Sequence, residues 1–253
     1  MAHMTTALVT GAARRIGAAI AGDLAANGFA IALHYHRAGA EAEALAERIV
    51  RQGGRAVALQ ADLTDETQAG TLVQRAAAAL GPVRLLVNSA SIFADDSAAA
   101  PDFATWDRHF AIHLKAPALL TADLARQLRD NEDGLVVNVI DQRVWKLTPS
   151  FFSYTLSKAA LWTATQTMAQ AFAPRLRVNA IGPGPTVVSE RQTPADFQAQ
   201  LDGLIMKRGP ALSEFGATIR YLWQARSVTG QMIALDGGQH LAWQTPDVTG
   251  MPE

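Results

Sequence analysis

The sequence contains no cysteine among its 253 residues. This absence excludes disulfide bonds, thiolate metal sites and cysteine nucleophiles. The sequence also has no surplus of positive charge, since 22 Lys and Arg residues face 23 Asp and Glu residues for a net charge of −1. A protein that binds nucleic acid needs cations to neutralise the phosphate backbone, so nucleic acid is not an expected partner.

Long apolar runs are missing as well. None of them approaches the ~18 residues that a membrane-spanning helix requires, and the N-terminus lacks the basic start, apolar stretch and cleavage site of a secretory signal. Residues 1–3, ahead of Met4, have the character of a cloning remnant. We therefore expect a cytoplasmic, globular protein with no membrane association, long enough to bury a large core.

Short apolar segments rich in β-formers alternate with helix-length amphipathic segments along almost the whole chain. This alternation predicts an α/β protein with a parallel sheet covered by helices on both faces. There is no linker, charge block or repeat, so residues 1–253 are expected to form one domain with a doubly wound, seven-stranded sheet. The expected strands are 7–10, 30–35, 56–60, 85–88, 135–140, 177–181 and 232–235. The expected helices are 15–27, 40–52, 66–80, 106–129, 151–172, 194–206 and 213–224.

A glycine-containing turn follows the first expected strand directly. Gly11 allows a tight turn, and Gly17 allows the next helix to pack closely on the strand, so that the free N–H groups of the helix start face a pyrophosphate. An ordinary strand-to-helix turn is the alternative, which the position of the motif disfavours. Arg14 and Arg15 stand at the helix start, where cations oppose the helix dipole unless an anion is bound or solvent screens them.

The end of the second expected strand indicates which dinucleotide is bound. An NAD-binding domain usually has an acidic residue about 20 positions past the glycines, where it binds the ribose 2′-hydroxyl. This chain has His36 and Arg37 there, and together with Arg15 they suit a 2′-phosphate. The predicted cofactor is therefore NADPH. His34 and His36 share a strand face but lack a third ligand nearby, so no metal site is predicted.

Tyr154 and Lys158 lie four residues apart on one face of an expected helix. A phenol with a pKa near ~10 is a poor acid at neutral pH unless its anion is stabilised. A lysine ammonium one turn away provides this stabilisation, and a nicotinamide held alongside adds to it. A surface Tyr–Lys pair is the alternative. Combined with the glycine turn, the pair predicts hydride transfer with Tyr154 as the proton donor.

Taken together, these motifs resemble the short-chain dehydrogenase/reductase family over essentially the whole chain. The resemblance implies a Rossmann-type fold, a homotetramer, and catalytic roles for Asp141, Tyr154 and Lys158. It implies that the cofactor contacts Gly11, Arg15, Ile16, Gly17, His36, Arg37, Asp62, Leu63, Asn88, Ser89, Ala90, Tyr154, Lys158, Pro183 and Gly184.

Three positions depart from the usual family pattern. Arg15 replaces a glycine, Asp141 replaces the serine thirteen positions before Tyr154, and His113 replaces an asparagine. The first two departures resemble the pteridine reductase branch, and His113 is similar to bacterial dihydromonapterin reductases. The role of His113 stays open between holding a relay water and being a buried, hydrogen-bonded histidine.

The replacement of serine by Asp141 has a chemical reason. A serine hydroxyl polarises a ketone oxygen, whereas a carboxyl group can carry a proton towards a C=N nitrogen and accept hydrogen bonds from aminopyrimidine N–H groups. The predicted function is NADPH-dependent reduction of a dihydropterin of the dihydromonapterin, dihydrobiopterin or dihydrofolate type. The alternatives are a carbonyl or 3-oxoacyl reductase of the same family and a non-catalytic NADP-binding sensor.

Four residues are predicted to contact the substrate. Phe93 and Trp145 would sandwich the flat pterin against the nicotinamide, although plain core packing would explain them equally well. Ser91 is a hydrogen-bonding group, and Pro185 opens a segment, 185–194, that is expected to cover the substrate. The sequence leaves open which residues of that segment touch it.

Overall fold

The computed structural model describes residues 4–188, 192–245 and 249. Its seven strands form one parallel sheet in the order β3-β2-β1-β4-β5-β6-β7, which confirms the doubly wound, seven-stranded architecture. The strands are β1 (Thr5–Val9), β2 (Phe29–Tyr35), β3 (Ala56–Gln60), β4 (Val83–Asn88), β5 (Gly134–Val139), β6 (Leu176–Pro183) and β7 (Met232–Leu235).

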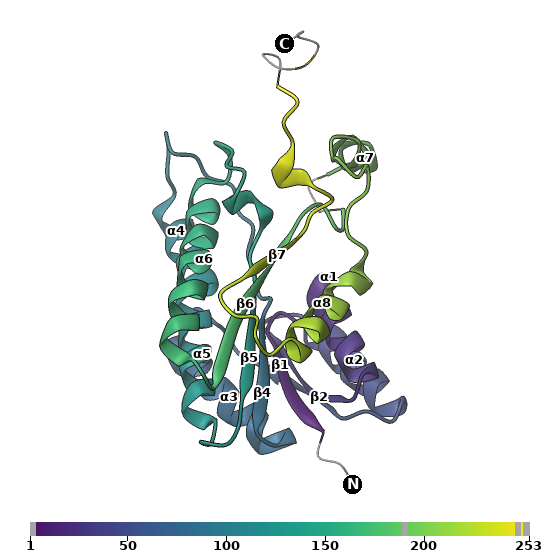
Figure 1. Ribbon diagram of the computed structural model, residues 1–253, viewed down its shortest axis with the longest axis vertical. Helices are drawn as coiled ribbons and strands as arrows, with labels where there is room; N and C mark the ends of the chain where they lie inside the picture. The colour runs from purple at the N-terminus through teal and green to yellow at the C-terminus, as the bar shows by residue number, and fades with distance from the viewer. Residues whose placement is uncertain (1–3, 189–191, 246–248, 250–253) are drawn as a thin grey trace.

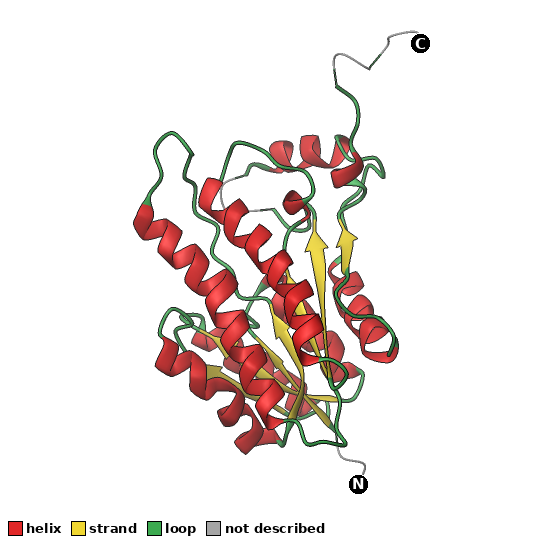
Figure 2. Cartoon of the chain, turned by 60° about the vertical axis from the view of Figure 1, so that its left-hand side comes forward, coloured by secondary structure: helices red, strands yellow, loops and turns green. Residues whose placement is uncertain are grey.

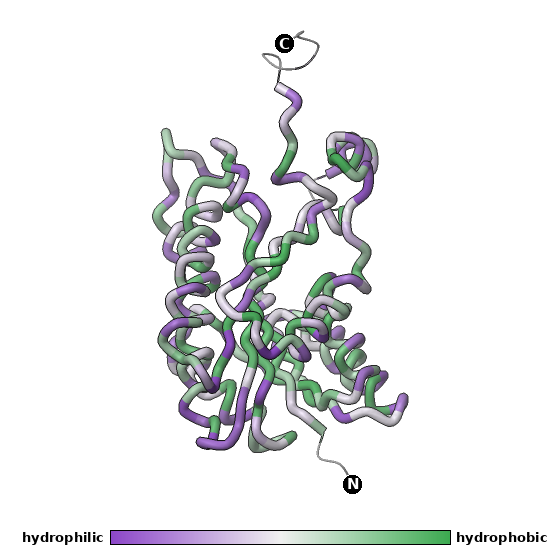
Figure 3. The backbone as a smooth tube through the Cα atoms, viewed as in Figure 1, coloured by the Kyte–Doolittle hydropathy of each residue, from purple (hydrophilic) through white to green (hydrophobic). Residues whose placement is uncertain are grey.

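Helices cover both faces of the sheet, with α1, α2 and α8 on one side and α3 to α6 on the other (Figure 1). A buried apolar cluster fills each interface, and hydrophobic segments follow the strands through the centre of the molecule (Figure 3). None of the described helices has the length and apolar character needed to cross a membrane. The helices are α1 (Arg15–Ala26), α2 (Gly39–Arg51), α3 (Glu66–Leu80), α4 (Phe103–Phe110), α5 (Ala116–Gln127), α6 (Phe152–Phe172), α7 (Pro194–Asp202) and α8 (Leu212–Gln224).

The prediction of a single helix over 106–129 is wrong. The chain forms α4, then a π-helical turn at Ala111–Lys115, and then α5. Pro117 explains the break, because it has no N–H and its ring would clash with the carbonyl four residues before it. The wider π turn avoids that contact, and such turns often occur at functional sites. The helix expected over 194–206 ends at Asp202, followed by Gly203.

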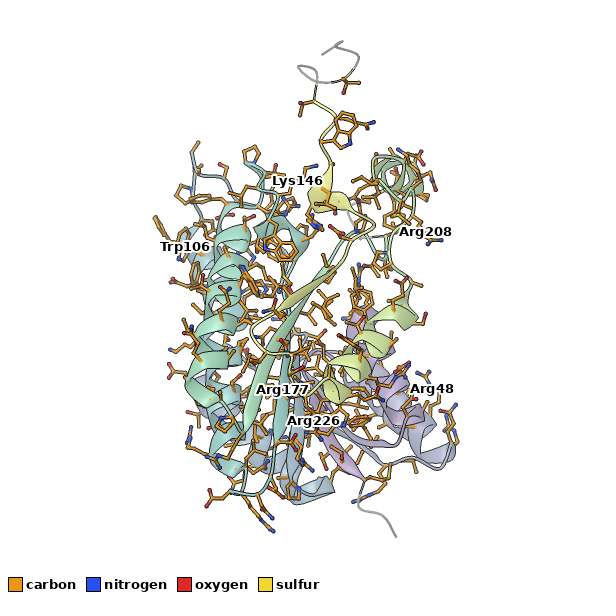
Figure 4. All side chains as sticks on the ribbon, viewed as in Figure 1. Arg48, Trp106, Lys146, Arg177, Arg208 and Arg226 are labelled. Carbon is orange, nitrogen blue, oxygen red and sulfur yellow. The ribbon has the colours of Figure 1, made fainter. Side chains whose placement is uncertain are left out.

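The strand order reverses between β1 and β4, because the chain winds outward from β1 in one direction and from β4 in the other. In open parallel sheets, ligands bind at the carboxyl ends of the strands beside such a reversal. Figure 2 shows the arrowheads of the strands pointing away from the N-terminus, so these carboxyl ends lie at the upper end of the molecule. In Figure 4, Lys146 marks this end, and Arg177 and Arg226 lie towards the opposite end.

Candidate active site

The turns after β1 and β4 pack directly against each other. Gly11 has a left-handed φ of +64°, and a Cβ atom there would lie 2.8 Å from the Cα of Ala90. A Cβ atom on Gly17 would lie 2.2 Å from the carbonyl oxygen of Gly11. Thr10 Oγ1 accepts the N–H groups of Ser89 and Ala90 at 2.9 and 3.0 Å. No side chain would fit at either glycine, and the start of α1 lies at the carboxyl ends of β1 and β4, where the strand order reverses.

His34 connects this turn to the end of β3. Its Nδ1 accepts the N–H of Gly11, and its Nε2 lies 3.1 Å from the carbonyl oxygen of Ala61, to which it donates. The ring is only 2% exposed, and burial lowers its pKa to about 4. His34 is therefore a neutral structural link. The described residues contain no group of three side chains able to hold a metal ion.

The side chains of His36 and Arg37 are exposed at the end of β2. His36 Nε2 lies 3.5 Å from Asp62 Oδ2, and Asp62 accepts hydrogen bonds from the N–H and hydroxyl of Thr64. Partial burial would raise the pKa of Asp62, but the Thr64 hydrogen bonds and the charges of His36 and Arg37 outweigh it and lower that pKa. This end of the crevice thus offers exposed nitrogen donors beside a carboxylate.

Arg15 lies at a different place. It begins α1 with a left-handed φ of 53°, which costs a non-glycine residue conformational energy. Its guanidinium donates to the carbonyl oxygens of Val187 and Val188 at 3.1 and 3.2 Å. The arginine therefore joins the start of α1 to the segment after β6, and its contact with a 2′-phosphate stays a prediction. Of the segment expected to cover the substrate, residues 189–191 lie outside the described residues.

Three predicted catalytic side chains meet above the ends of β5 and β6. Tyr154, in the first turn of α6, donates its Oη hydrogen to Asp141 Oδ2 at 2.9 Å. The other carboxylate oxygen of Asp141 accepts the N–H of Arg143 at 2.8 Å, which begins a short 3₁₀ turn. Lys158 Nζ donates to the carbonyl of Val139 at 2.8 Å and lies 5.7 Å from the centre of the Tyr154 ring.

The electrostatics of this group differ from the expectation based on the Tyr–Lys spacing. Burial, the charge of Asp141 and the hydrogen bond to it raise the pKa of Tyr154 well above its usual value, so that the phenol keeps its proton. Lys158 does not reverse this shift, because its ammonium is directed at the Val139 carbonyl. Burial lowers the pKa of Lys158 to about 8, against the opposing effect of Asp141.

Phe93 and Trp145 lie at the rim of the site and not in the core. Their exposed fractions are 41% and 42%. Phe93 stacks on Phe151 with ring centres 4.1 Å apart and meets the Tyr154 ring edge-on at 4.7 Å. A half-exposed ring beside Tyr154, as in Phe93, favours contact with a flat ligand. The ring of Trp145 instead meets those of Trp162 and His240, at 6.2 and 5.2 Å between ring centres. Pro185, by contrast, is buried, with its carbonyl oxygen against Gly209.

The remaining predicted cofactor positions line the same edge of the sheet. Asn88 donates to Asn138, which in turn donates to Thr165, so a buried chain of polar groups supports the end of β4. A Cβ atom on Gly184 would lie 2.6 Å from the Cα of Asp236, so the turn after β6 also requires glycine. Leu63 is buried, Ile16 and Pro183 are half-buried, and Ser91 is exposed.

Known proteins with a similar sequence or a similar structure include reductases and dehydrogenases. The family model for short chain dehydrogenases matches residues 5–198. The crystal structure of FolM alternative dihydrofolate reductase 1 from Brucella suis, in complex with NADP, has a TM-score of 0.95 and 59% identity, covering 98% of this chain and 100% of that one. The dihydromonapterin reductase of Klebsiella pneumoniae is 30% identical over 92% of this chain and 96% of its own. A 3-oxoacyl-[acyl-carrier-protein] reductase from Synechocystis is 28% identical over 92% and 95%.

The family match at residues 5–198 covers well over half of the chain, and the sheet has the parallel, doubly wound order expected for this family. The chain belongs to the short-chain dehydrogenase family.

Proposed function

We propose that this protein is an NADPH-dependent reductase that reduces a C=N bond of a dihydropterin. The observation that carries the proposal is the hydrogen bond between Tyr154 Oη and Asp141 Oδ2, which places two exchangeable-proton groups 2.9 Å apart. Reduction of a ketone and reduction of an imine each add a hydride to carbon and a proton to the heteroatom. A carboxyl group at position 141, unlike the usual serine hydroxyl, can in addition accept two hydrogen bonds from the N–H groups of an aminopyrimidine ring. The Brucella and Klebsiella proteins named above support this substrate class.

The residues present fit the cofactor. Gly11 and Gly17 are packed too closely for a side chain. Arg14, which precedes α1, supplies no side-chain cap, and uncapped N–H groups at a helix start suit a pyrophosphate. His36 and Arg37 supply exposed donors for a 2′-phosphate. Asp62, Asn88 and Gly184 would hold the remainder. When bound there, NADPH supplies the hydride and its nicotinamide ring is oxidised.

This chain's residues manage the proton. The raised pKa of Tyr154 keeps its hydroxyl protonated until a substrate nitrogen accepts the proton. Asp141 orients that hydroxyl by accepting its hydrogen bond, and its carboxylate oxygens can also accept hydrogen bonds from the N–H groups of the pterin. Lys158 places a positive charge beneath the Tyr154 ring, which stabilises the phenolate that forms on proton loss.

Phe93, Trp145 and Ser91 are the proposed substrate contacts. Two half-exposed aromatic rings suit a planar bicyclic ring, and the Ser91 hydroxyl offers a hydrogen bond beside it.

We also propose a homotetramer in the cytoplasm, supported by the family resemblance and by the small and aromatic side chains Ala159, Ala160, Trp162 and Ala164 on α6. Light scattering of the purified protein tests the assembly.

The substrate assay follows NADPH oxidation with dihydromonapterin, dihydrobiopterin, dihydrofolate and a set of small ketones, at about pH 5.5 and about pH 7.5. We expect turnover of a dihydropterin, faster at the lower pH. Turnover of ketones alone would contradict the proposal and favour the carbonyl reductase alternative. Binding of NADPH without turnover of any compound would favour the sensor.

A further inference from the structure

Two buried histidines lie one helical turn apart beside the catalytic tyrosine. His109 is at the end of α4 and His113 is in the π-helical turn; their exposed fractions are 0% and 1%. Their rings stack 5.5 Å apart at an angle of 15°. Both meet the ring of Tyr154 edge-on, at 5.8 Å for His109 and 5.3 Å for His113.

Each of the two rings joins α6 to the segment that follows β4. Nδ1 of His113 lies 2.8 Å from Ser157 Oγ on α6, and its Nε2 accepts the N–H of Ile92 at 3.3 Å and lies 2.9 Å from Ser91 Oγ. In the same manner, Nδ1 of His109 lies 2.8 Å from Ser153 Oγ, while its Nε2 accepts the N–H of Ala94 at 3.4 Å.

These contacts fix the tautomer. A backbone N–H can only donate, so each Nε2 must be unprotonated and each Nδ1 must carry the hydrogen that it donates to a serine. Burial lowers the pKa of both histidines. For His113, the charge of Lys158 adds to this effect, as does His109 whenever it is protonated. For His109, Arg108 and Lys158 add to it and Asp96 opposes it.

Asp96 reinforces the same junction. One of its carboxylate oxygens accepts the N–H of Ser153 at 2.9 Å, and its carbonyl oxygen accepts the N–H of Phe152 at 3.2 Å. Residue 151, which precedes α6, supplies no side-chain cap. The first turn of α6, which carries Tyr154, is therefore capped by the segment that also carries Ser91 and Phe93.

We propose that His109 and His113 are positioning residues that act as a neutral clamp, holding the substrate-binding segment 91–96 against the first turn of α6 so that Tyr154 and Phe93 face the same substrate. The inference rests on the proposed function of Tyr154 as proton donor. Because both nitrogens of each ring are already hydrogen-bonded, neither histidine serves as the proton carrier. Protonation of Nε2 would place two N–H donors opposite each other, so the hydrogen bond to the backbone N–H would be lost and segment 91–96 would be released.

The test replaces each histidine by Phe, which keeps a ring without nitrogens, and by Gln, which keeps a hydrogen-bonding group. We expect His109→Phe and His113→Phe to lower kcat/KM for the dihydropterin at least about ten-fold, because small misplacements of reacting groups are costly. Amide hydrogen exchange in 91–96 and 152–158 should become faster. The Kd of NADPH should stay within about two-fold, and the Gln variants should recover part of the loss. Asp107→Asn, an exposed neighbour on α4, is the matched control and should change neither readout.

A second readout is the pH profile. Wild-type kcat/KM should fall again at low pH as the histidines protonate, and the Gln variants should lose this acid limb.

A large kinetic loss in the Phe variants with unchanged exchange would overturn the clamp and assign a histidine to proton transfer. Unchanged kinetics and exchange would overturn it as well. If the Phe variants do not fold, Ser153→Ala and Ser157→Ala remove one partner of each ring and give the same test. If the wild type reduces no dihydropterin, the proposed function fails, while the exchange result still decides the clamp.

Discussion

The proposed cofactor end of the site is built from tightly packed glycines in the turns after β1 and β4, and the side chains of His36 and Arg37 nearby are exposed to solvent. At the chemical end the groups are side chains in the interior: Tyr154 is 6% exposed and Lys158 is 3% exposed. A buried charge or hydroxyl needs a specific partner, whereas an exposed one does not.

Because of this difference, substitutions at the two ends should have different effects. Exposed donors at the cofactor end can be changed with little cost to folding, so their loss should affect cofactor affinity alone. At the chemical end each group is also part of a buried hydrogen-bond network, so a change there reaches the rate of reaction and the local structure together.

The largest effect is expected for Tyr154→Phe, which removes only the phenolic oxygen. The proton donor is lost, so kcat for a dihydropterin should fall by about 10²–10⁴-fold, the usual contribution of a general acid. The Kd of NADPH, measured by its fluorescence, should be nearly unchanged. Tyr221→Phe, on the exposed face of α8, is the matched control. Retention of most activity in Tyr154→Phe would assign proton donation to another group.

Asp141→Ser restores the usual family residue and should lower dihydropterin turnover at least about ten-fold, or ~1.4 kcal/mol in the barrier. Any rise of the wild-type rate with falling pH that depends on the carboxyl group should also disappear in this variant. Steady-state rates between about pH 5 and about pH 8 measure both effects. Asp107→Asn, exposed on α4, serves as the control. Full activity in Asp141→Ser would remove the argument for a pterin substrate from this position.

At the cofactor end, Arg37→Gln should raise the KM for NADPH by about ten-fold, because a charge-assisted hydrogen bond to the 2′-phosphate is lost. The KM for NADH, which lacks that phosphate, should not change, and neither should the melting temperature. Arg48→Gln on α2 is the control (Figure 4). Equal effects on both cofactors would show that Arg37 acts on the fold or on a part common to the two dinucleotides.

Much of this contrast could be predicted from the sequence. The alternation of strands and helices specifies the sheet, and a motif such as Gly11 to Gly17 is local, so its position after β1 follows from a few neighbouring residues. The Tyr154–Lys158 spacing is likewise a property of one helix. These features depend on periodicity and on backbone space, which a single sequence records directly.

The remainder depends on contacts between distant segments. The π turn, which a continuous apolar pattern conceals, places His109 and His113 against residues 44 positions further along the chain. The raised pKa of Tyr154 required the position of Asp141, and the contact of Arg15 with the segment after β6 could not be inferred from local spacing. The only sequence signal for the clamp is two histidines four residues apart in an amphipathic segment.

The smallest effect is expected for His34→Gln, and it is an effect on the free energy of unfolding. His34 is an exception at the cofactor end, because its side chain is buried. Its pKa falls from 6.5 to about 4 on folding, so between these values the unfolded chain binds a proton that the folded chain does not. The contribution of His34 to the free energy of unfolding is therefore fully present above about pH 6.5. It declines as pH falls towards 4, by about 1 kcal/mol between about pH 7 and about pH 5.5. Urea denaturation at the two pH values measures this decline. His34→Gln should reduce the decline by about this amount and leave the part that comes from His109 and His113, whereas the exposed control His36→Gln should keep the full decline. An equal decline in wild type and His34→Gln would place the acid sensitivity elsewhere, and the neutral link between Gly11 and Ala61 would then contribute only geometry.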